Sequence, residues 1–319
     1  MYLKGPVAFA VEILFYPLTV FGSAVSLYYL LGVASPQQLP WVPLIPVTAC
    51  VVVFMILERL MPYRLEWGEA QGDTVTDMLQ TFVTLPVASK LAEAALPVVF
   101  FFPLAWLTGF IGAELWPTSM SFWLQTLAAL LAAEFGYYWM HRWSHASELL
   151  WRFHAVHHGA ERVYWINSGR FHFLDAFLGS FVYFLPLALL GAPEEILLMT
   201  ITLSAVTGFM EHVNIRFRAG FLNYFFNTAQ LHRWHHSNHL HESNTNYGKA
   251  LSVWDLLFGT FHLPKGQAVK DVGIKDTRVP NSFLGQLVYP FRKGETEASS
   301  ARPDPGVPGD GSGRQRPVE

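Results

Sequence analysis

Long apolar runs constrain this chain more than any other feature of its sequence. Runs at about residues 7–34, 41–60 and 121–140 each reach the roughly 20 residues that an α-helix needs to cross a bilayer. Only 14% of the residues are charged, against about 25% in soluble domains. The mean hydropathy is +0.27. The sequence therefore predicts an all-α, multi-pass integral membrane bundle rather than the roughly two soluble domains that its length would suggest.

Two further apolar stretches have interrupted patterns. Residues 78–111 contain Lys90 and Glu93, and are long enough for one crossing plus an interfacial helix. Residues 173–210 are broken in the middle by the sequence GAPEE at 191–195. With arms near the lower length limit for full spans, this stretch predicts a helical hairpin that enters the membrane and returns.

The chain divides into three segments by composition. Residues 1–112 are predicted to form N-terminal transmembrane helices. Residues 113–294 combine spans with histidine motifs, and residues 295–319 are rich in Pro, Gly, Ser and charge. The last composition is typical of a disordered tail.

Basic residues indicate which side of the membrane each end of the bundle faces. Arg59 and Arg64 follow the second apolar run, whereas the loop at 113–119 has no Lys or Arg. Beyond the run that ends at residue 140 come four more arginines: Arg142, Arg152, Arg162 and Arg170. The positive-inside rule then places the histidine motifs in the cytoplasm, and Lys4 places the N-terminus there too.

Histidines occur in three spaced clusters after these spans. One H-x-x-x-H motif and two H-x-x-H-H motifs supply eight of them: His141 and His145; His154, His157 and His158; His232, His235 and His236. Residues three and four apart share one face of a helix, so each motif presents its imidazoles together. Eight histidines exceed the three or four ligands of one zinc ion, and we expect a cap that holds two metal ions with open positions.

Ligand type alone does not name the metal, because neutral imidazole suits iron, zinc, copper and nickel. The chain contains no Glu-x-x-His and no H-E-x-x-H sequence. A carboxylate-bridged di-iron bundle and a common zinc protease are therefore not the models for this site.

Three more residues are candidates for the site. His212 and His172 should both lie at the membrane boundary, level with the clusters, where the alternative for each is a hydrogen-bonded interfacial histidine. Glu134 precedes His141 by seven residues, on the same helix face. An acid inside a span is costly and usually functional, so we expect Glu134 to accept the far N–H of a ligating imidazole, or else to snorkel or pair with an arginine.

Other residues set limits on function. Cys50 is the only cysteine, which excludes an intrachain disulfide, cysteine-ligated zinc and iron–sulfur clusters. The net charge of −3 does not point to a nucleic-acid partner. His239 and His241 are left out of the site as possible loop histidines, and His262 is interpreted as structural.

At these residues the chain resembles the fatty acid hydroxylase/sterol desaturase superfamily of membrane non-haem di-iron oxygenases. The matching pieces, HRWSH, HAVHH, RFHF, EHVN, HRWHH and NTNYGKALSVWDLLFGTF, span about residues 121–262. The last two look most like the alkylglycerol monooxygenase and bacterial sterol-desaturase-like branch. One departure is that many relatives have His-Pro where this chain has His172-Phe173.

The resemblance implies that residues 113–294 are a catalytic domain in which two iron ions activate O2 to hydroxylate or desaturate a lipid. By the same resemblance, His212 and the eight motif histidines would bind iron. The chain has no haem-binding His-Pro-Gly-Gly, no Gly-x-Gly-x-x-Gly and no cysteine cluster. Electrons would come from a separate reductase, ferredoxin or cytochrome, or from a pterin. The substrate would be a fatty acyl, sterol or ether lipid.

Three alternatives remain at this point. A zinc-dependent membrane hydrolase would recruit Glu134 or Glu211 as its base. A metal transporter or sensor would use the histidines as a binding loop, although transport sites usually lie near the membrane midplane. A bis-histidine haem protein would need paired single histidines on facing helices rather than clusters.

Overall fold

The computed structural model describes residues 2–111, 115–275 and 277–292, and in these ranges the chain is helical without any strand. Only three isolated bridges between extended residues occur there. The α-helices are α1 Gly5–Val33, α2 Leu44–Leu60, α3 Thr74–Leu79, α4 Leu85–Ile111, α5 Phe122–Ala146, α6 Glu148–His158, α7 Phe173–Leu190, α8 Glu194–His212, α9 Ala229–His235, α10 Leu240–Ser243, α11 Val253–Leu257 and α12 Phe283–Val288. Short 3₁₀ turns lie at Leu39–Trp41, Glu66–Gly68, Trp165–Gly169, Gly220–Tyr224 and Tyr289–Phe291.

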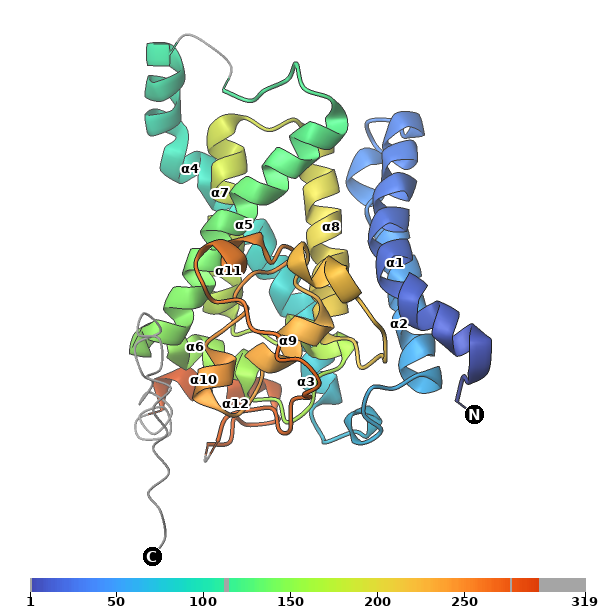
Figure 1. The fold of residues 1–319 in the computed structure, drawn as a ribbon. Coiled ribbons are helices and arrows are strands. Elements are labelled where there is room, and N and C mark those ends of the chain that lie inside the picture. Colours follow the sequence, from blue (N-terminus) through green and yellow to red (C-terminus); the bar gives the residue numbers. More distant parts are fainter. Residues whose placement is uncertain (1, 112–114, 276, 293–319) are drawn as a thin grey trace, which may run out of the picture.

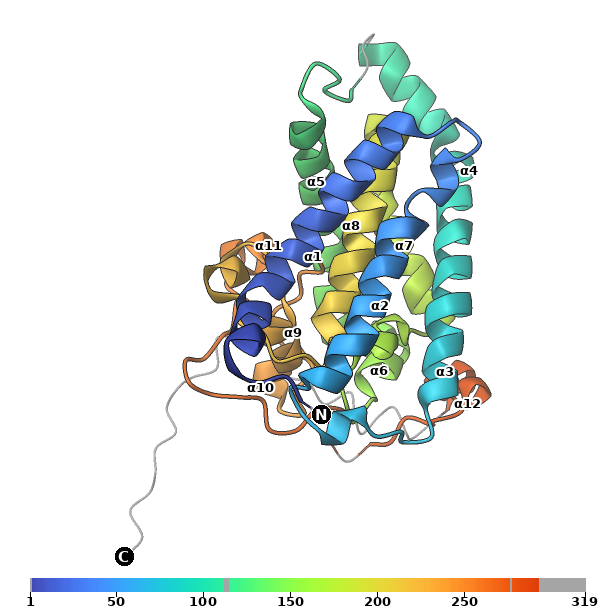
Figure 2. The ribbon, with the colours of Figure 1, turned by 90° about the vertical axis from the view of Figure 1, so that its right-hand side faces the viewer.

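The long helices run up and down in chain order, and the short helices form a cap at one end (Figure 1). Helices α1 and α2 make a hairpin beside the others, α4 and α5 follow, and α7 and α8 make the predicted second hairpin (Figures 1 and 2). The turn between α7 and α8 uses Gly191 at φ 72°, a left-handed conformation that favours glycine. The described N-terminus lies at the same end as the cap, which contains α6, α9, α10 and α12 (Figure 1).

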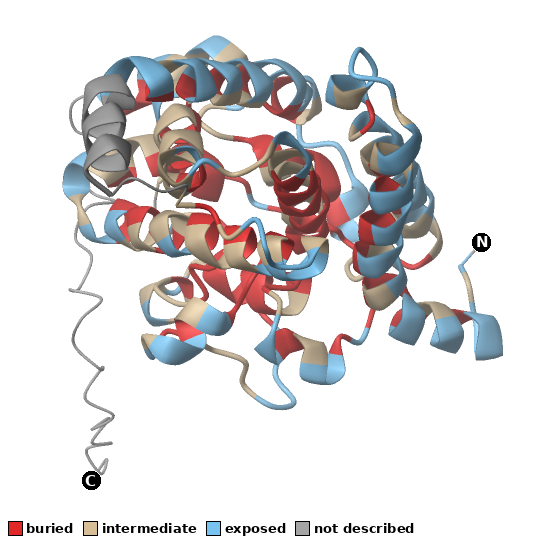
Figure 3. Cartoon of the chain, turned by 90° about the horizontal axis from the view of Figure 1, so that it is seen from above, coloured by how far each residue is buried: buried red, intermediate tan, exposed pale blue. Residues whose placement is uncertain are grey.

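Four helical stretches are long and apolar enough to cross a membrane: Gly5–Val33, Leu39–Leu60, Thr74–Val99 and Phe173–Leu190. Helices α5 and α8, which we also expected to enter the membrane, are more polar than these four. Helix α8 is central, because it packs against α1, α2 and α5, and 11 of its 19 residues are buried. Figure 3 shows buried residues along nearly the whole of a central helix, whereas the outer helices are exposed on one side.

The stretch at 78–111 differs from the prediction of a span plus a separate interfacial helix. Helix α3 continues into α4 through one π-helical turn, Gln80–Thr84, so that the chain is helical from residue 74 to 111. Lys90 and Glu93 do not interrupt α4, because both side chains are exposed and pair with each other at 2.6 Å.

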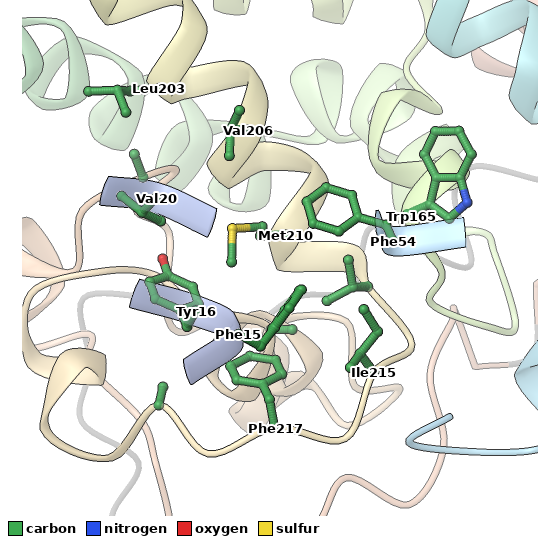
Figure 4. Close-up of a cluster of buried hydrophobic side chains, with 14 of the residues drawn as sticks. Phe15, Tyr16, Val20, Phe54, Trp165, Leu203, Val206, Met210, Ile215 and Phe217 are labelled. Carbon is green, nitrogen blue, oxygen red and sulfur yellow. The ribbon is translucent and has the colours of Figure 1, made fainter. Parts of the chain in front are cut away.

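An aromatic and aliphatic core joins α1 and α2 to α8. The Phe15 ring lies 5.9 Å from that of Phe54 and 5.5 Å from that of Phe217, and Val206 and Met210 of α8 are fully buried beside them (Figure 4). Because lipid tails are as apolar as these side chains, such a core stabilises helix association through van der Waals packing. This core fixes the lower half of α8, which ends at His212.

A buried ion cluster ties α3 to the segment that follows α6. Arg162 pairs with Asp73 at 2.6 Å, and Arg170 pairs with Asp77 at 3.1 Å, with all four side chains at most 3% exposed. In the sequence, both arginines serve only as indicators of the cytoplasmic side. They are instead structural, since Arg170 Nε also donates to the carbonyl of Val156 beside the second histidine motif.

Packing crosses the predicted boundary at residues 112 and 113, because α4 lies along α7 and α1 lies along α8. The division into 1–112 and 113–294 therefore stays a prediction from the sequence. The predicted tail at 295–319 lies outside the described residues.

Candidate metal centre

Nine buried histidines converge at the cap end of α5 and α8. They form two groups, in each of which the potential ligand atoms all lie within 4.8 Å of one another. The first group contains His141, His145, His154, His158 and His235, and the second contains His157, His212, His232 and His236. The structure thus brings together all eight motif histidines and His212, as the sequence predicts, on four different elements.

Each H-x-x-H-H motif divides its histidines between the two groups. On α6, His154 and His158 lie one turn apart and join the first group, whereas His157 points to the second. At α9 the assignment is reversed, because His232 and His236 join the second group and the middle histidine joins the first. Spacings of three and four both keep the rings on one side of the helix, and the angle between the two positions lets the middle ring face the neighbouring group. Each H-x-x-H-H motif therefore contributes to both groups and fixes the position of one group relative to the other.

The outer nitrogens of several rings are fixed by hydrogen bonds to oxygen acceptors. His141 Nδ1 donates to the carbonyl of Tyr247 at 2.8 Å, and His235 Nδ1 donates to the carbonyl of Thr245 at 2.8 Å. His154 Nδ1 lies 2.9 Å from Asp175 Oδ2. Since these acceptors have no proton to give, they fix each ring as the tautomer with a bare Nε2.

A second set of contacts fixes His212. Its Nδ1 lies 2.8 Å from Asn167 Oδ1. The Asn167 amide is oriented, because its Nδ2 donates to the carbonyl of Arg162 at 2.7 Å and its Oδ1 also accepts the Tyr164 backbone N–H at 3.2 Å. Asn167 is therefore an acceptor toward His212.

The inner Nε2 atoms face one another closely. The Nε2 atoms of His141 and His154 are 3.1 Å apart, those of His145 and His158 are 3.1 Å apart, and those of His212 and His232 are 2.9 Å apart. In the first pair both outer nitrogens carry the proton, so two bare lone pairs face each other. At the metal–nitrogen length of about 2.1 Å seen for zinc, two ligands at right angles lie about 3.0 Å apart. The spacing thus fits a shared cation.

Burial keeps these imidazoles neutral, as metal ligation requires. Desolvation, with the neighbouring imidazoles adding to it, lowers the pKa well below the ordinary 6.5 in a set of five rings: His157, His158, His232, His235 and His236. The Nε2 of His235 is buried without a hydrogen-bond partner among the described residues. An orphaned ring nitrogen inside a histidine group is the atom that a metal ion would satisfy.

The structure does not bring His172 into either group. His172 caps the N-terminus of α7, where its Nδ1 accepts the backbone N–H of Leu174 at 3.1 Å. Its Nε2 lies 3.2 Å from the carbonyl of Leu287. Nδ1 thus caps α7 and Nε2 ties the start of α7 to α12, so both nitrogens are used and we do not propose His172 as a ligand.

Glu134 is fully buried but makes no hydrogen bond to an imidazole, contrary to our expectation. Its Oε2 accepts the backbone N–H groups of Lys249, Ala250 and Leu251 at 3.1, 2.9 and 3.4 Å. These residues continue the loop that presents the Tyr247 carbonyl to His141. Glu134 therefore acts on the site through this loop.

Several residues that orient the histidines are not among the sequence candidates. Asp175 and Asn167 hold the rings of His154 and His212 directly, and Asp255 accepts the backbone N–H groups of Tyr247 and Gly248 at 2.7 and 2.8 Å. Asp175 carried a usable signal, because it is an acid at the start of an apolar run. Asn167 carried none that local spacing reveals. His239, His241 and His262 lie outside both histidine groups, as expected.

A cavity of 210 Å³ opens onto the histidines from within the bundle. Its walls come from α4, α5, α7 and α8, with Leu85, Phe184 and Ile201 among the apolar side chains. Four ligand-group histidines line it: His141, His157, His212 and His232. A long apolar group that enters between these helices would therefore reach both sites.

These features define a helical membrane protein with two adjacent histidine groups, each able to hold a metal ion, beside an apolar cavity. A family model described as fatty acid hydroxylase matches residues 126–260. The ornithine lipid hydroxylase OlsE of Rhizobium tropici is 37% identical over 303 residues, covering 92% of this chain and 88% of that protein. The chain belongs to the fatty acid hydroxylase family.

More distant relatives share only the site region. The alkylglycerol monooxygenases of Danio rerio and Homo sapiens are 32% and 30% identical, over 46% and 44% of this chain. The matches span about a third of the length of those proteins, 31% and 32%. No solved structure matches the chain.

Family membership identifies the protein as an oxygen-dependent oxidoreductase that hydroxylates membrane lipids. The comparisons give no support to the zinc-hydrolase or transporter interpretations.

Proposed function

We propose that the nine histidines bind two iron ions, and that the protein uses O2 and external electrons to hydroxylate a polar membrane lipid of the ornithine-lipid kind. The observation that carries this proposal is the meeting of the two histidine groups with one apolar cavity. The substrate class follows from the relative that covers nearly the whole chain. In the overall balance, one C–H bond, one O2, two electrons and two protons give an alcohol and water.

When bound, the iron ions supply the redox chemistry that activates O2. The residues of the chain position the reaction. Asp175, Asn167 and the Tyr247 carbonyl hold ligand rings in one tautomer and one orientation, which raises ligand basicity and fixes the site before substrate arrives. The apolar cavity walls exclude water and hold the lipid against the histidine-lined floor.

The electron donor and the orientation belong to the same proposal. The donor would be a reductase, ferredoxin or cytochrome that reaches the cap, or a reduced pterin. The cap and the described N-terminus share one end of the bundle, and the positive-inside rule favours the cytoplasm for that end (Figure 1).

Metal analysis of the detergent-purified protein tests the proposal. We expect about two irons per chain in the wild type, in keeping with the two groups, and a loss in His157→Ala. His241→Ala is the matched control, because His241 has a side chain 79% exposed and lies outside both groups. A single metal ion that survives the loss of His157 would contradict the two-site assignment. Because zinc can replace iron during expression, zinc-loaded protein is reconstituted with iron before this comparison.

Lipid analysis tests the reaction. Cells with the gene, grown under ¹⁸O2, should contain a lipid heavier by one ¹⁸O atom that is missing from cells carrying His157→Ala. Label in an alkylglycerol product instead would move the substrate to the ether-lipid class. A new double bond without label would show desaturation rather than hydroxylation.

A further inference from the structure

Lys249 places a cation in the wall of the cavity. Its side chain lines the cavity, where its ammonium lies 5.4 Å from the ring centre of Tyr137 and 5.1 Å from that of Tyr183. Its backbone N–H is held by Glu134 Oε2 at 3.1 Å, which fixes the base of the side chain. Among the described residues that line the cavity, Lys249 is the one lysine or arginine.

The ammonium has no hydrogen-bond acceptor or ion-pair partner within bonding distance among the described residues. Burial lowers the pKa of Lys249, while the carboxylates of Glu134 and Glu211 act against that shift from longer range. Glu134 Oε2 is already used by three backbone N–H groups. Three ammonium donors inside a cavity are costly to leave without acceptors.

Two other roles of Lys249, a cation–π contact and a structural ion pair, explain its position less well. The faces of the two tyrosines attract a cation, but they offer no acceptor for its N–H groups. A purely structural ion pair is absent, because no acid among the described residues lies within ion-pair distance of the ammonium. Asp175 accepts from His154 at 2.9 Å, and Glu211 Oε1, which is buried without a hydrogen-bond partner among the described residues, lies 3.9 Å from His232 Nδ1.

We propose that Lys249 binds an anionic oxygen group, a carboxylate or a phosphate, on the lipid substrate. This inference rests on the proposed function for the identity of the cavity as the substrate site. A charged group on the lipid would supply the acceptors that the ammonium lacks. A neutral lipid would leave the ammonium without them, so Lys249 selects against neutral substrates.

Binding measurements on the metal-loaded, detergent-purified full chain test the proposal. Lys249→Met removes the charge at similar length, and Lys249→Arg keeps it. Lys90→Met is the matched control, because Lys90 has a side chain 78% exposed on α4 and pairs with Glu93. The probes are an ornithine lipid with a free carboxylate, phosphatidic acid and a neutral alkylglycerol. Binding is measured as the shift in thermal unfolding midpoint against lipid concentration, and metal content is measured in parallel.

We expect Lys249→Met to weaken binding of an anionic probe by about tenfold or more, because truncating one partner of a buried charge pair affects dissociation strongly. Lys249→Arg should retain most of that binding, and neutral alkylglycerol should bind Lys249→Met at least as well as it binds the wild type. A loss confined to the ornithine lipid assigns a carboxylate, and a loss confined to phosphatidic acid assigns a phosphate. Equal loss for the neutral probe, or no loss for either anionic probe, overturns the proposal.

The result is separable from the proposed function. Charge-dependent lipid binding with no ¹⁸O incorporation would keep the subsite and remove the hydroxylase assignment. Hydroxylation that is unchanged in KM and kcat by Lys249→Met would keep the enzyme and remove the subsite. If Lys249→Met fails to fold, Lys249→Arg and the comparison of charged with neutral lipids on the wild type still decide the question.

Discussion

The Asp175–His154 hydrogen bond offers the sharpest test of how this site is held. Asp175 Oδ2 lies 2.9 Å from His154 Nδ1, and both side chains are at most 3% exposed. Asp175→Asn keeps the size and an acceptor oxygen but removes the charge. A hydrogen bond to a charged group contributes about 1.5–3 kcal/mol and a neutral one about 0.5–1.5 kcal/mol. The expected loss is therefore about 1.4 kcal/mol, or about tenfold in metal affinity. Asp175→Ala should cost about 10–100-fold, because the ring then also loses its fixed orientation.

Competition with a graded series of chelators would measure this loss. Only the first histidine group uses His154, so one of the two metal equivalents should leave at about tenfold lower chelator strength, and the other should stay. Asp73→Asn is the matched control, because Asp73 is a buried carboxylate that pairs with Arg162 and Arg170 instead of an imidazole. It should lower thermal stability without changing metal affinity in the folded fraction. Equal chelator curves for wild type and Asp175→Asn would refute the role given to Asp175.

Three further predictions concern stability and access. Acidification from pH 7 to pH 5 should destabilise the metal-free protein, because the five imidazoles with lowered pKa values stay neutral when folded but take up protons on unfolding. This stability is present above the unfolded pKa of 6.5 and is lost progressively as the pH falls below it. A urea midpoint that does not move between these pH values would contradict it. Glu134→Ala should lower the free energy of unfolding by about 3 kcal/mol or more, because three buried N–H groups lose their acceptor. Glu134→Gln should lower the free energy of unfolding by less than Glu134→Ala does. Equal denaturation curves for Glu134→Ala and wild type would rule this out. Gly208→Leu should fill the cavity and abolish lipid turnover while metal content stays unchanged. Gly32→Leu, whose Cβ would meet nothing within 4 Å, should leave turnover intact. Full turnover in Gly208→Leu would place the substrate elsewhere.

Much of the site follows from spacing that can be read locally. The H-x-x-x-H and H-x-x-H-H motifs place their rings on one side of a helix wherever that helix packs, and all eight motif histidines lie in the two groups. The apolar runs likewise predict helices at α1, α2, α5, α7 and α8, since an apolar run of that length forms a helix in lipid. The membrane setting, the helical fold and the histidine composition of the two groups are thus determined by the sequence itself.

Which histidine shares a metal site with which was decided by packing. His157 meets His236 across 79 residues, and His235 joins the group of α5 and α6, because α9 packs against α8 and the cap closes beneath α5. The periodicity of a single helix does not predict which histidines of different helices meet. The same limit explains His172, which is close to the ligands in sequence but is turned by the start of α7 toward Leu287.

Burial of charge also depended on the tertiary structure. Arg162 and Arg170 follow an apolar run in the sequence, as cytoplasmic surface arginines do, yet they lie inside the protein because Asp73 and Asp77 arrive from α3 to pair with them. Glu134 lies on the histidine face of α5, yet its carboxylate is taken by backbone N–H groups of a loop more than 110 residues away. Local sequence determines which face of a helix a side chain occupies. The partner that meets that face comes from distant segments, and only their packing decides which one it is.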